Sequence, residues 1–128
     1  GTELHKVFET FDFRHIEAAL NRLSKNEQSM MKRFLAHQEV QSIATGRCYQ
    51  EYPFMDFVNG EEQSGVIDLV VDYDDHIDLI DYKLKTIDDE AYQKQLSTYR
   101  NYLAKKFNKP IFSYLYSIRD NRFEKVGD

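Results

Sequence analysis

The sequence is poor in the residues that cross-link or break up a small protein. Its 128 residues include one cysteine, two prolines, five glycines and no tryptophan. A single cysteine, Cys48, excludes a disulfide framework and any metal site built from cysteines alone, which favours a reducing, cytoplasmic setting. No apolar run approaches the ~18 residues needed to cross a bilayer, so we expect no membrane partner. The G-x-x-x-x-G-K-[ST] phosphate-binding motif is also missing, so we expect no ATP-driven motor within these residues.

What the sequence does contain is enough apolar material for one folded core. Apolar residues make up 41% of the chain, and nine Phe and nine Tyr are among them. This length and composition predict a single domain over residues 1–128. The net charge of −5 argues against a protein that coats duplex DNA by charge alone.

The charges are unevenly spread. Residues 1–82 hold 7 Lys/Arg and 16 Asp/Glu, whereas residues 83–128 hold 10 Lys/Arg and 6 Asp/Glu. An acidic half beside a basic half suits a cation site next to an anion-binding surface. Chance asymmetry in an ordinary soluble domain explains the same numbers equally well.

Apolar periodicity divides the chain into helices and strands. Helical spacing indicates two helices over residues 4–11 and 13–23, separated by a break at Asp12. It also indicates a third helix, which begins at a cap formed by Ser24 or Asn26 and ends at Gly46. The spacing then predicts strands over 48–58, 65–73, 76–83, 110–118 and 123–126, and a helix over 88–107. Pro53 indicates an edge or a bulge in the first strand. This order predicts an α/β fold with a central mixed β-sheet flanked by α-helices.

A hairpin in the middle of the chain concentrates the polar chemistry. If Asp74 and Asp75 form a two-residue turn, Asp68 lies directly opposite Asp81, and Lys83 shares the face of Asp81. Val66 and Val70 would flank Asp68, so three charges would gather at one end of an apolar face. Like charges that face each other are destabilising unless one is protonated or a cation lies between them.

Oxygen ligands of this kind favour Mg²⁺ or Mn²⁺ over softer metals. A neighbouring lysine can hold an attacking water or stabilise charge on a phosphate. The alternative is a solvent-facing hairpin with an ordinary Lys–Asp pair. A three-residue turn would also offset the two aspartates unless a bulge restored the register.

Three further polar residues have simple structural explanations when taken alone. Gln95 and Tyr99 lie four residues apart on one face of the predicted helix, where the Gln could contact a phosphate or a metal-bound water. A surface Gln beside a core Tyr is the simpler interpretation. His5 lies beside the apolar stripe of the first helix, and in isolation it is a typical boundary histidine.

Four short segments follow one another along the chain: Gly1-Thr2-Glu3-Leu4-His5 with Phe11-Asp12-Phe13, then Gly65-Val66-Ile67-Asp68-Leu69-Val70, Leu79-Ile80-Asp81-Tyr82-Lys83 and Gln95-Leu96-Ser97-Thr98-Tyr99. Taken together and in this order, they resemble the RecB/AddA-type nuclease domain of the PD-(D/E)xK superfamily, found at the C-terminal end of bacterial helicase–nuclease subunits that process DNA ends. The resemblance implies a restriction-endonuclease-like fold. It also implies that the chain is an excised piece of a larger protein.

The resemblance also implies roles. Asp68, Asp81, His5 and the backbone carbonyl of Tyr82 would bind Mg²⁺ or Mn²⁺, and Lys83 would orient or activate the water. The resemblance implies that Gln95 and Tyr99 would support the site or contact the DNA backbone. The basic charge of the second half of the chain adds Lys85 and Arg100 as residues that could contact the DNA backbone. Glu51 matches an E-x-P-F strand that often precedes the metal strands, and a structural role is equally open to it. Some relatives carry a four-cysteine iron–sulfur cluster, which Cys48 alone cannot hold.

The implied function is a metal-dependent deoxyribonuclease, exonucleolytic, that acts in DNA end processing and recombinational double-strand break repair. One implied partner is DNA, which the protein would contact through the DNA backbone with little sequence preference. The other implied partners are the helicase domains of its own chain, where ATP would bind, and a second helicase–nuclease subunit. The alternative is a non-catalytic module with a nuclease-like fold that binds DNA or a partner. A restriction-like or junction-cleaving member of the same superfamily is a further alternative, although such members usually lack the His helix and the Gln–Tyr pair.

Overall fold

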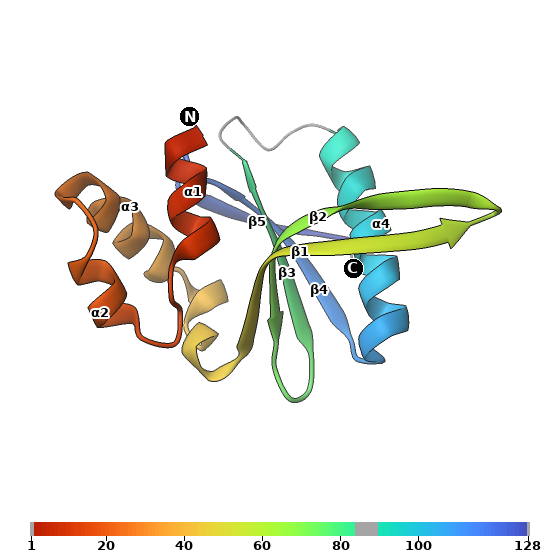
Figure 1. Ribbon diagram of the computed structural model, residues 1–128, viewed down its shortest axis with the longest axis horizontal. Coiled ribbons are helices and arrows are strands. Elements are labelled where there is room, and N and C mark those ends of the chain that lie inside the picture. Colours follow the sequence, from red (N-terminus) through yellow and green to blue (C-terminus); the bar gives the residue numbers. More distant parts are fainter. Residues whose placement is uncertain (1, 84–89, 128) are drawn as a thin grey trace.

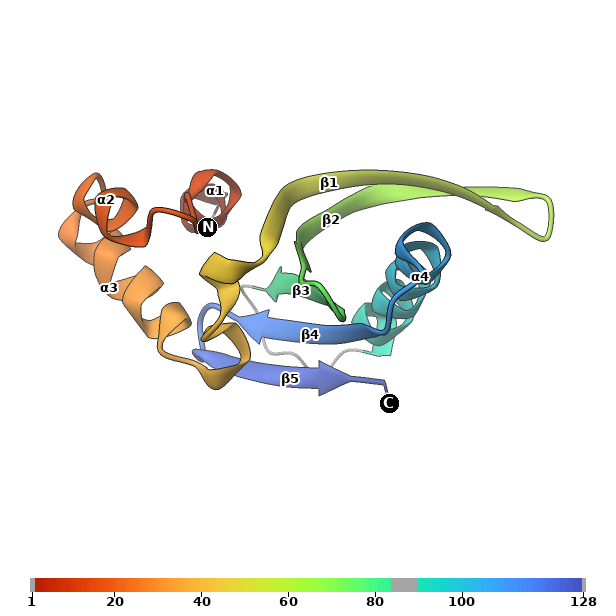
Figure 2. The same cartoon turned by 90° about the horizontal axis from the view of Figure 1, so that it is seen from below.

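A five-stranded mixed sheet forms the centre of the computed structural model, which describes residues 2–83 and 90–127. The strands lie side by side in chain order, as Figure 2 shows by turning the view of Figure 1. They are β1 (Arg47–Val58), β2 (Glu61–Asp72), β3 (Ile77–Lys83), β4 (Ile111–Ser117) and β5 (Arg122–Val126). β3 and β4 run parallel, and the other neighbouring pairs are antiparallel.

Helices lie on both sides of the sheet (Figure 2). One side carries α1 (Thr2–Thr10), α2 (Ile16–Asn21), α3 (Lys25–Leu35) and two short 3₁₀ helices (Gln38–Val40 and Ile43–Thr45). The other side carries α4 (Glu90–Phe107), which connects the parallel strands β3 and β4 as such a pair requires. The predicted α/β fold, a central mixed sheet flanked by helices, is therefore confirmed. The predicted start of α4 at Asp88 lies outside the described residues.

The N-terminal helices begin and end where local side chains satisfy the backbone. α1 ends at Thr10, and the side chain of Asp12 accepts a hydrogen bond from the backbone N–H of Arg14 at 3.0 Å. Ser24 caps α3 in a capping box with Glu27, so Ser24 rather than Asn26 is the cap. The predicted helix end at Gly46 is wrong: α3 ends at Leu35, and two separate 3₁₀ helices, the second of which contains Ile43, follow before Gly46.

Two hydrophobic clusters, one on each side of the sheet, hold these layers together. Aromatic rings dominate the cluster under α1 and α3, where Phe8 lies 4.3 Å from Tyr82 and Phe34 lies 4.9 Å from Tyr116 between ring centroids. Aliphatic side chains dominate the cluster under α4, with Leu79, Leu96, Leu103 and Leu115 fully buried. Within the described residues, no helix combines the length and apolar character that crossing a membrane would need.

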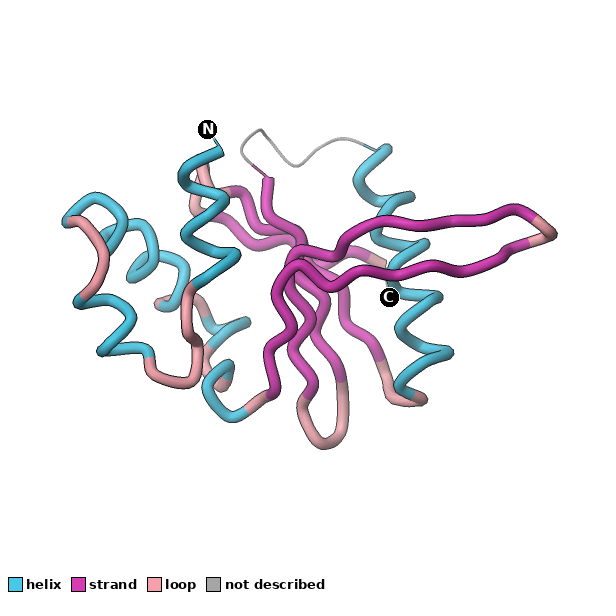
Figure 3. Tube along the Cα trace, in the orientation of Figure 1, coloured by secondary structure: helices cyan, strands magenta, loops and turns pink. Residues whose placement is uncertain are grey.

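β1 and β2 form a long ribbon that extends beyond the sheet and crosses over α4 (Figures 2 and 3). β1 is an edge strand, as Pro53 indicated. The kink lies at Glu51, whose φ of 53° is left-handed, and the pairs on either side of it are Gln50 with Leu69 and Tyr52 with Ile67.

The ribbon's change of direction corrects one expectation about the apolar face. Val66 does not flank Asp68 in a buried face: it is 47% exposed, while Ile67 is buried in the same cluster as Val70. Side chains do not alternate strictly between the two faces of β2 here, because the ribbon turns over α4 near Asp68. Ile67 therefore faces the same cluster as Val70, and Val66 faces solvent.

Candidate functional site

The register of β2 and β3 brings Asp68 and Asp81 to the same place. Tyr73 donates its backbone N–H to the carbonyl of His76 at 3.0 Å, so Asp74 and Asp75 form the two-residue turn. The paired residues then run to Leu69 opposite Ile80, and Asp68 and Asp81 come next on the two strands. The predicted two-residue turn and register are confirmed.

At Asp68 a hydrogen bond to a side chain replaces the regular backbone hydrogen bonds between β2 and β3. Its Oδ2 accepts a hydrogen bond from the backbone N–H of Tyr82 at 2.8 Å. The main chain of Tyr82 therefore lies directly beside the Asp68 carboxylate, while the Tyr82 ring is buried on the other side of the sheet against Phe8. The strands thus present carboxylate oxygens at the point where their regular pairing stops.

The carboxyl groups of Asp68 and Asp81 repel each other when both are charged. Both are nearly covered, with side chains 13% exposed for Asp68 and 5% for Asp81. Burial raises the pKa of Asp68, and the hydrogen bond to Asp81 and the charge of that group raise it further, against the opposing effect of the Tyr82 N–H. Without a cation, the folded state therefore favours a proton on Asp68.

His5 reaches this cluster from α1. Its Nε2 lies 3.6 Å from Oδ1 of Asp68, and its Nδ1 lies 3.5 Å from a carboxylate oxygen of Glu9 one helical turn along. Phe8 holds α1 in place by packing on the ring of Tyr82. The boundary histidine of the isolated helix is thus brought against a carboxylate from β2.

Glu51 joins His5 and Asp68. One ligand atom from each of the three residues lies within 4.8 Å of the other two. Among the described residues, this is the group whose His and carboxylate atoms lie close enough to hold one metal ion. Oε2 of Glu51 is buried without a hydrogen-bond partner, and burial followed by the charge of Glu9 raises the pKa of Glu51. An orphaned carboxylate oxygen among three donors suits a cation ligand.

A second turn in the sequence predicts the position of Glu51. The turn at Asn59 and Gly60 pairs Val58 with Glu61, and the same counting that placed Asp68 opposite Asp81 places Glu51 opposite Asp68. Glu51 keeps its left-handed φ because the surroundings hold it there, a pattern found where strain serves a site.

Gln50 connects the helix to the ribbon beside this group. Its Nε2 donates to the carbonyl of Phe8 at 2.8 Å and to the carbonyl of Phe11 at 2.7 Å. The Phe8 carbonyl lies in the last turn of α1 and the Phe11 carbonyl just beyond it, where a helix end leaves carbonyl groups without partners in the helix. Gln50 thereby ties the helix that carries His5 to the strand that carries Glu51, a role that no local sequence pattern predicts.

Lys83 lies at the end of β3, next to Asp81. Its Nζ is 2.9 Å from Oδ2 of Asp81 and 3.8 Å from the centroid of the Tyr92 ring on α4. The lysine is mostly buried, so its charge acts in a medium of lower polarity than water. Its ammonium group is held between the carboxylates and the start of α4.

Tyr99 on α4 faces the same carboxylates, and Gln95 donates a hydrogen bond to the Tyr99 hydroxyl. Burial raises the pKa of Tyr99, and the charge of Asp81 adds to this effect. The Tyr99 ring packs on Phe54, which leaves little room for a side chain at Gly65: a Cβ there would lie 3.0 Å from the Phe54 ring. Tyr99 is a core residue and Gln95 is largely exposed, so the pair also fits the simpler interpretation of a surface Gln beside a core Tyr.

The described structure does not bring Arg100, one of the predicted DNA-contacting residues, to the carboxylates. The guanidinium of Arg100 lies so close to Gly127, past the end of β5, that a Cβ there would be 2.7 Å from its Nη1. β5 is the edge strand opposite β1, so Arg100 lies away from the cluster. Lys85 lies outside the described residues. Lys105 forms an ion pair with Asp56 of the ribbon at 3.0 Å.

The donor set fits a hard divalent cation. Most of its donors are carboxylate oxygens, which suit Mg²⁺ and Mn²⁺, and one imidazole nitrogen lies beside them. The buried Oε2 of Glu51 and the mutual repulsion of Asp68 and Asp81 are both relieved by a positive ion. His5, Glu51, Asp68 and Asp81 are the residues that could hold it.

Comparisons with known proteins point to one family and one fold. The model of the PD-(D/E)XK nuclease superfamily matches residues 1–127. The chain is also similar to a solved structure from Eubacterium rectale titled "Putative exonuclease", with a TM-score of 0.56 at 11% sequence identity. That similarity covers 100% of this chain and 57% of the other, and it indicates the restriction-endonuclease-like fold. A search of curated proteins found no match to the sequence.

Proposed function

Because the chain belongs to the PD-(D/E)XK nuclease superfamily, we propose that it hydrolyses phosphodiester bonds of DNA at the carboxylate cluster between β2, β3 and α1. The observation that carries the proposal is the convergence of Asp68 and Asp81, which face each other at the end of the β2–β3 ladder, with Lys83 beside Asp81. Buried like charges are costly to maintain, and a catalytic cation site is a physical reason for keeping them.

Each residue has a defined task in this proposal. Asp68 and Asp81 hold the divalent metal, and His5, Glu51 and the carbonyl of Tyr82 complete its surroundings. When bound, the metal lowers the pKa of water and neutralises phosphate charge. Lys83 orients the attacking water and stabilises negative charge on the phosphate with its ammonium group. Tyr99 and Gln95 act as positioning residues, since Gln95 holds the Tyr99 hydroxyl by a hydrogen bond and the charge of Asp81 acts on that hydroxyl.

We propose further that cleavage is exonucleolytic and that the domain works within a helicase–nuclease in DNA end processing and double-strand break repair. The support is the order and spacing of the four resembling segments around a single cluster. ATP and a second subunit would then act on the larger assembly. A non-catalytic module that binds DNA or a partner is the competing function, and the experiment below separates the two.

The test combines a binding measurement with an activity measurement. Mn²⁺ and Mg²⁺ are expected to raise the melting temperature of the wild-type chain, because ligands that bind only the folded state stabilise it. Cleavage of end-labelled linear DNA should require the metal and stop with a chelator. Asp81→Ala should lose both responses and remain folded, whereas Asp72→Ala, which removes only an ion pair with Lys109, should keep both.

The outcomes decide between the candidate functions. Full cleavage by Asp81→Ala contradicts the assignment of the site. A metal-dependent melting temperature without any cleavage by the wild type favours the binding module. Comparison of linear with covalently closed circular DNA then tests the exonucleolytic mode, since only the linear form offers ends.

A further inference from the structure

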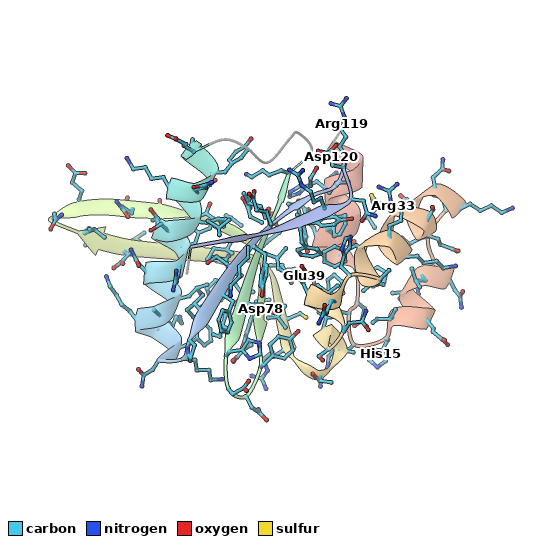
Figure 4. All side chains as sticks on the ribbon, turned by 180° about the vertical axis from the view of Figure 1, so that it is seen from behind. His15, Arg33, Glu39, Asp78, Arg119 and Asp120 are labelled. Carbon is cyan, nitrogen blue, oxygen red and sulfur yellow. The ribbon has the colours of Figure 1, made fainter. Side chains whose placement is uncertain are left out.

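A second acidic group lies at the opposite end of the β2–β3 hairpin, on the side of the sheet that carries α3. It lines a pocket of about 970 Å³ between the hairpin turn, the two 3₁₀ helices and strands β4 and β5. Figure 4 labels two of its members, Asp78 from β3 and Glu39 from the first 3₁₀ helix. The charged residues of this pocket are Glu39, Asp74, Asp75, Asp78, His76 and Lys125.

Asp78 is the buried member of this group. Its side chain is only 8% exposed, and its Oδ1 has no hydrogen-bond partner in the described structure. Nε2 of His76 lies 3.5 Å from this Oδ1, a distance too long for a good hydrogen bond. His76 is itself engaged by Asp75 through Nδ1 at 2.7 Å. A buried carboxylate with an unmet acceptor, on the wall of a pocket, calls for a donor from outside the chain.

Aromatic faces make up much of the remaining wall. Tyr73 stacks on His76 with ring centroids 4.7 Å apart, and Phe112 meets His76 edge-on at 5.5 Å. Nζ of Lys125 already lies 4.7 Å from the centroid of Phe112, so this wall accepts a positive charge. Carboxylates combined with aromatic faces are the surroundings that protonated amines and guanidinium groups favour.

The spacing of the carboxylates distinguishes an organic cation from a bare metal ion. Across the described residues, three His or carboxylate ligand atoms lie within 4.8 Å of one another at His5, Glu51 and Asp68, and this pocket offers no such triplet. A small ion needs ligands this close, whereas an extended cation can bridge separated carboxylates and lie on a ring.

We propose that the pocket formed by Glu39, Asp78 and the aromatic wall of Tyr73 and Phe112 binds an organic cation, an alkylguanidinium or alkylammonium group. Two sources share this chemistry: an arginine or lysine side chain of a polypeptide, and a free polyamine. The lysine of the wall, Lys125, then acts as a built-in competitor. Nothing in this proposal depends on DNA cleavage.

Titrations followed by backbone amide NMR signals test the proposal in the whole chain. The probes are N-acetyl-argininamide for the polypeptide source, spermidine for the polyamine source, and N-acetyl-citrullinamide as an uncharged control of equal size. Saturable shifts at residues 73–78 with at least one cationic probe, and none with the citrulline compound, are expected. The cation that binds more tightly identifies the source, and the lack of saturable shifts with both overturns the proposal.

Variants make the assignment specific. Asp78→Asn is expected to weaken binding roughly tenfold or more, the scale of one charge-assisted hydrogen bond. Glu61→Gln, an exposed acid on the distant ribbon tip, should bind as the wild type does. If Asp78→Asn fails to fold, Lys125→Gln decides, because removal of the competing charge should tighten binding. Unchanged or weaker binding by Lys125→Gln contradicts the proposal.

Discussion

The inner and outer halves of the β1–β2 ribbon share one antiparallel register but differ in almost every other property. The inner half, residues 47–52 with 67–72, lies in the sheet and carries Glu51 and Asp68 beside α1. The outer half, residues 53–66, extends past the sheet and carries Met55, Phe57, Val58 and Val66, the large apolar side chains that are exposed in the described structure.

The difference shows that strand pairing and burial are decided separately. The Asn59–Gly60 turn sets the pairing of the whole ribbon, because turn geometry fixes register. Burial instead depends on which helix covers each side: α1 closes over the inner half, and α4 covers one face of the outer half through Phe54. The acidic residues of the inner half are consequently held in a medium where their charges interact strongly.

The largest contrast between the halves is expected at Asp68. Asp68→Asn should reduce metal-dependent cleavage by roughly 10²–10³-fold or more, the scale of losing one preorganised electrostatic group. The same change should stabilise the metal-free protein at neutral pH. The folded pKa of Asp68 is raised, so the folded state holds a proton that the unfolded chain releases, and wild-type stability falls as pH rises above about 4.

Urea unfolding in the presence of a chelator at pH 5 and pH 8 measures this effect. The wild type should lose more stability between the two pH values than Asp68→Asn does. Asp72→Asn on the same strand, which breaks an ion pair with Lys109 at 2.6 Å, is the matched control and should not be stabilised. An Asp68→Asn protein as destabilised at pH 8 as this control would contradict the strained-carboxylate picture.

A smaller effect is expected at Glu51, where the two halves meet. Glu51→Gly should raise the free energy of unfolding of the metal-free protein by about 1 kcal/mol, because glycine accepts the left-handed φ without strain. It should also diminish the rise in melting temperature that Mn²⁺ causes. Glu51→Gln keeps the backbone strain and removes only the charge, so it should diminish the Mn²⁺ effect without the gain in stability. Equal metal responses in both variants and the wild type would exclude Glu51 from the cation site.

The smallest effect is expected in the outer half. Phe57 is 64% exposed, so Phe57→Thr should change the free energy of unfolding by no more than about 0.5 kcal/mol and leave cleavage unchanged. Phe54→Thr, the same exchange three residues earlier on the face that packs against Tyr99, should destabilise the protein clearly. Chemical denaturation of both variants checks the contrast, and similar losses would show that the outer face is covered in solution.

The success of the sequence-based predictions varies along the chain with the range of the interactions involved. The Asp74–Asp75 turn and the Ser24 cap were predictable because each depends on residues within a few positions. The buried face around Val66 was predicted wrongly, because alternation assumes a straight ribbon and this one turns over α4. The convergence of His5 on Asp68 followed only from the family resemblance, since nothing local connects a helix at residue 5 to a strand at residue 68.

By itself, the sequence determined which acidic residues face each other across the strands, since two short turns set both registers and place Glu51, Asp68 and Asp81 on adjacent strands. The tertiary structure alone decided what surrounds them. The clamp from Gln50 to the end of α1 sets His5 against Asp68, and Tyr99 reaches the carboxylates from α4 while Arg100 beside it points to the far edge. Turn chemistry acts over a few residues, whereas these contacts arise only when distant helices pack onto the two faces of the sheet.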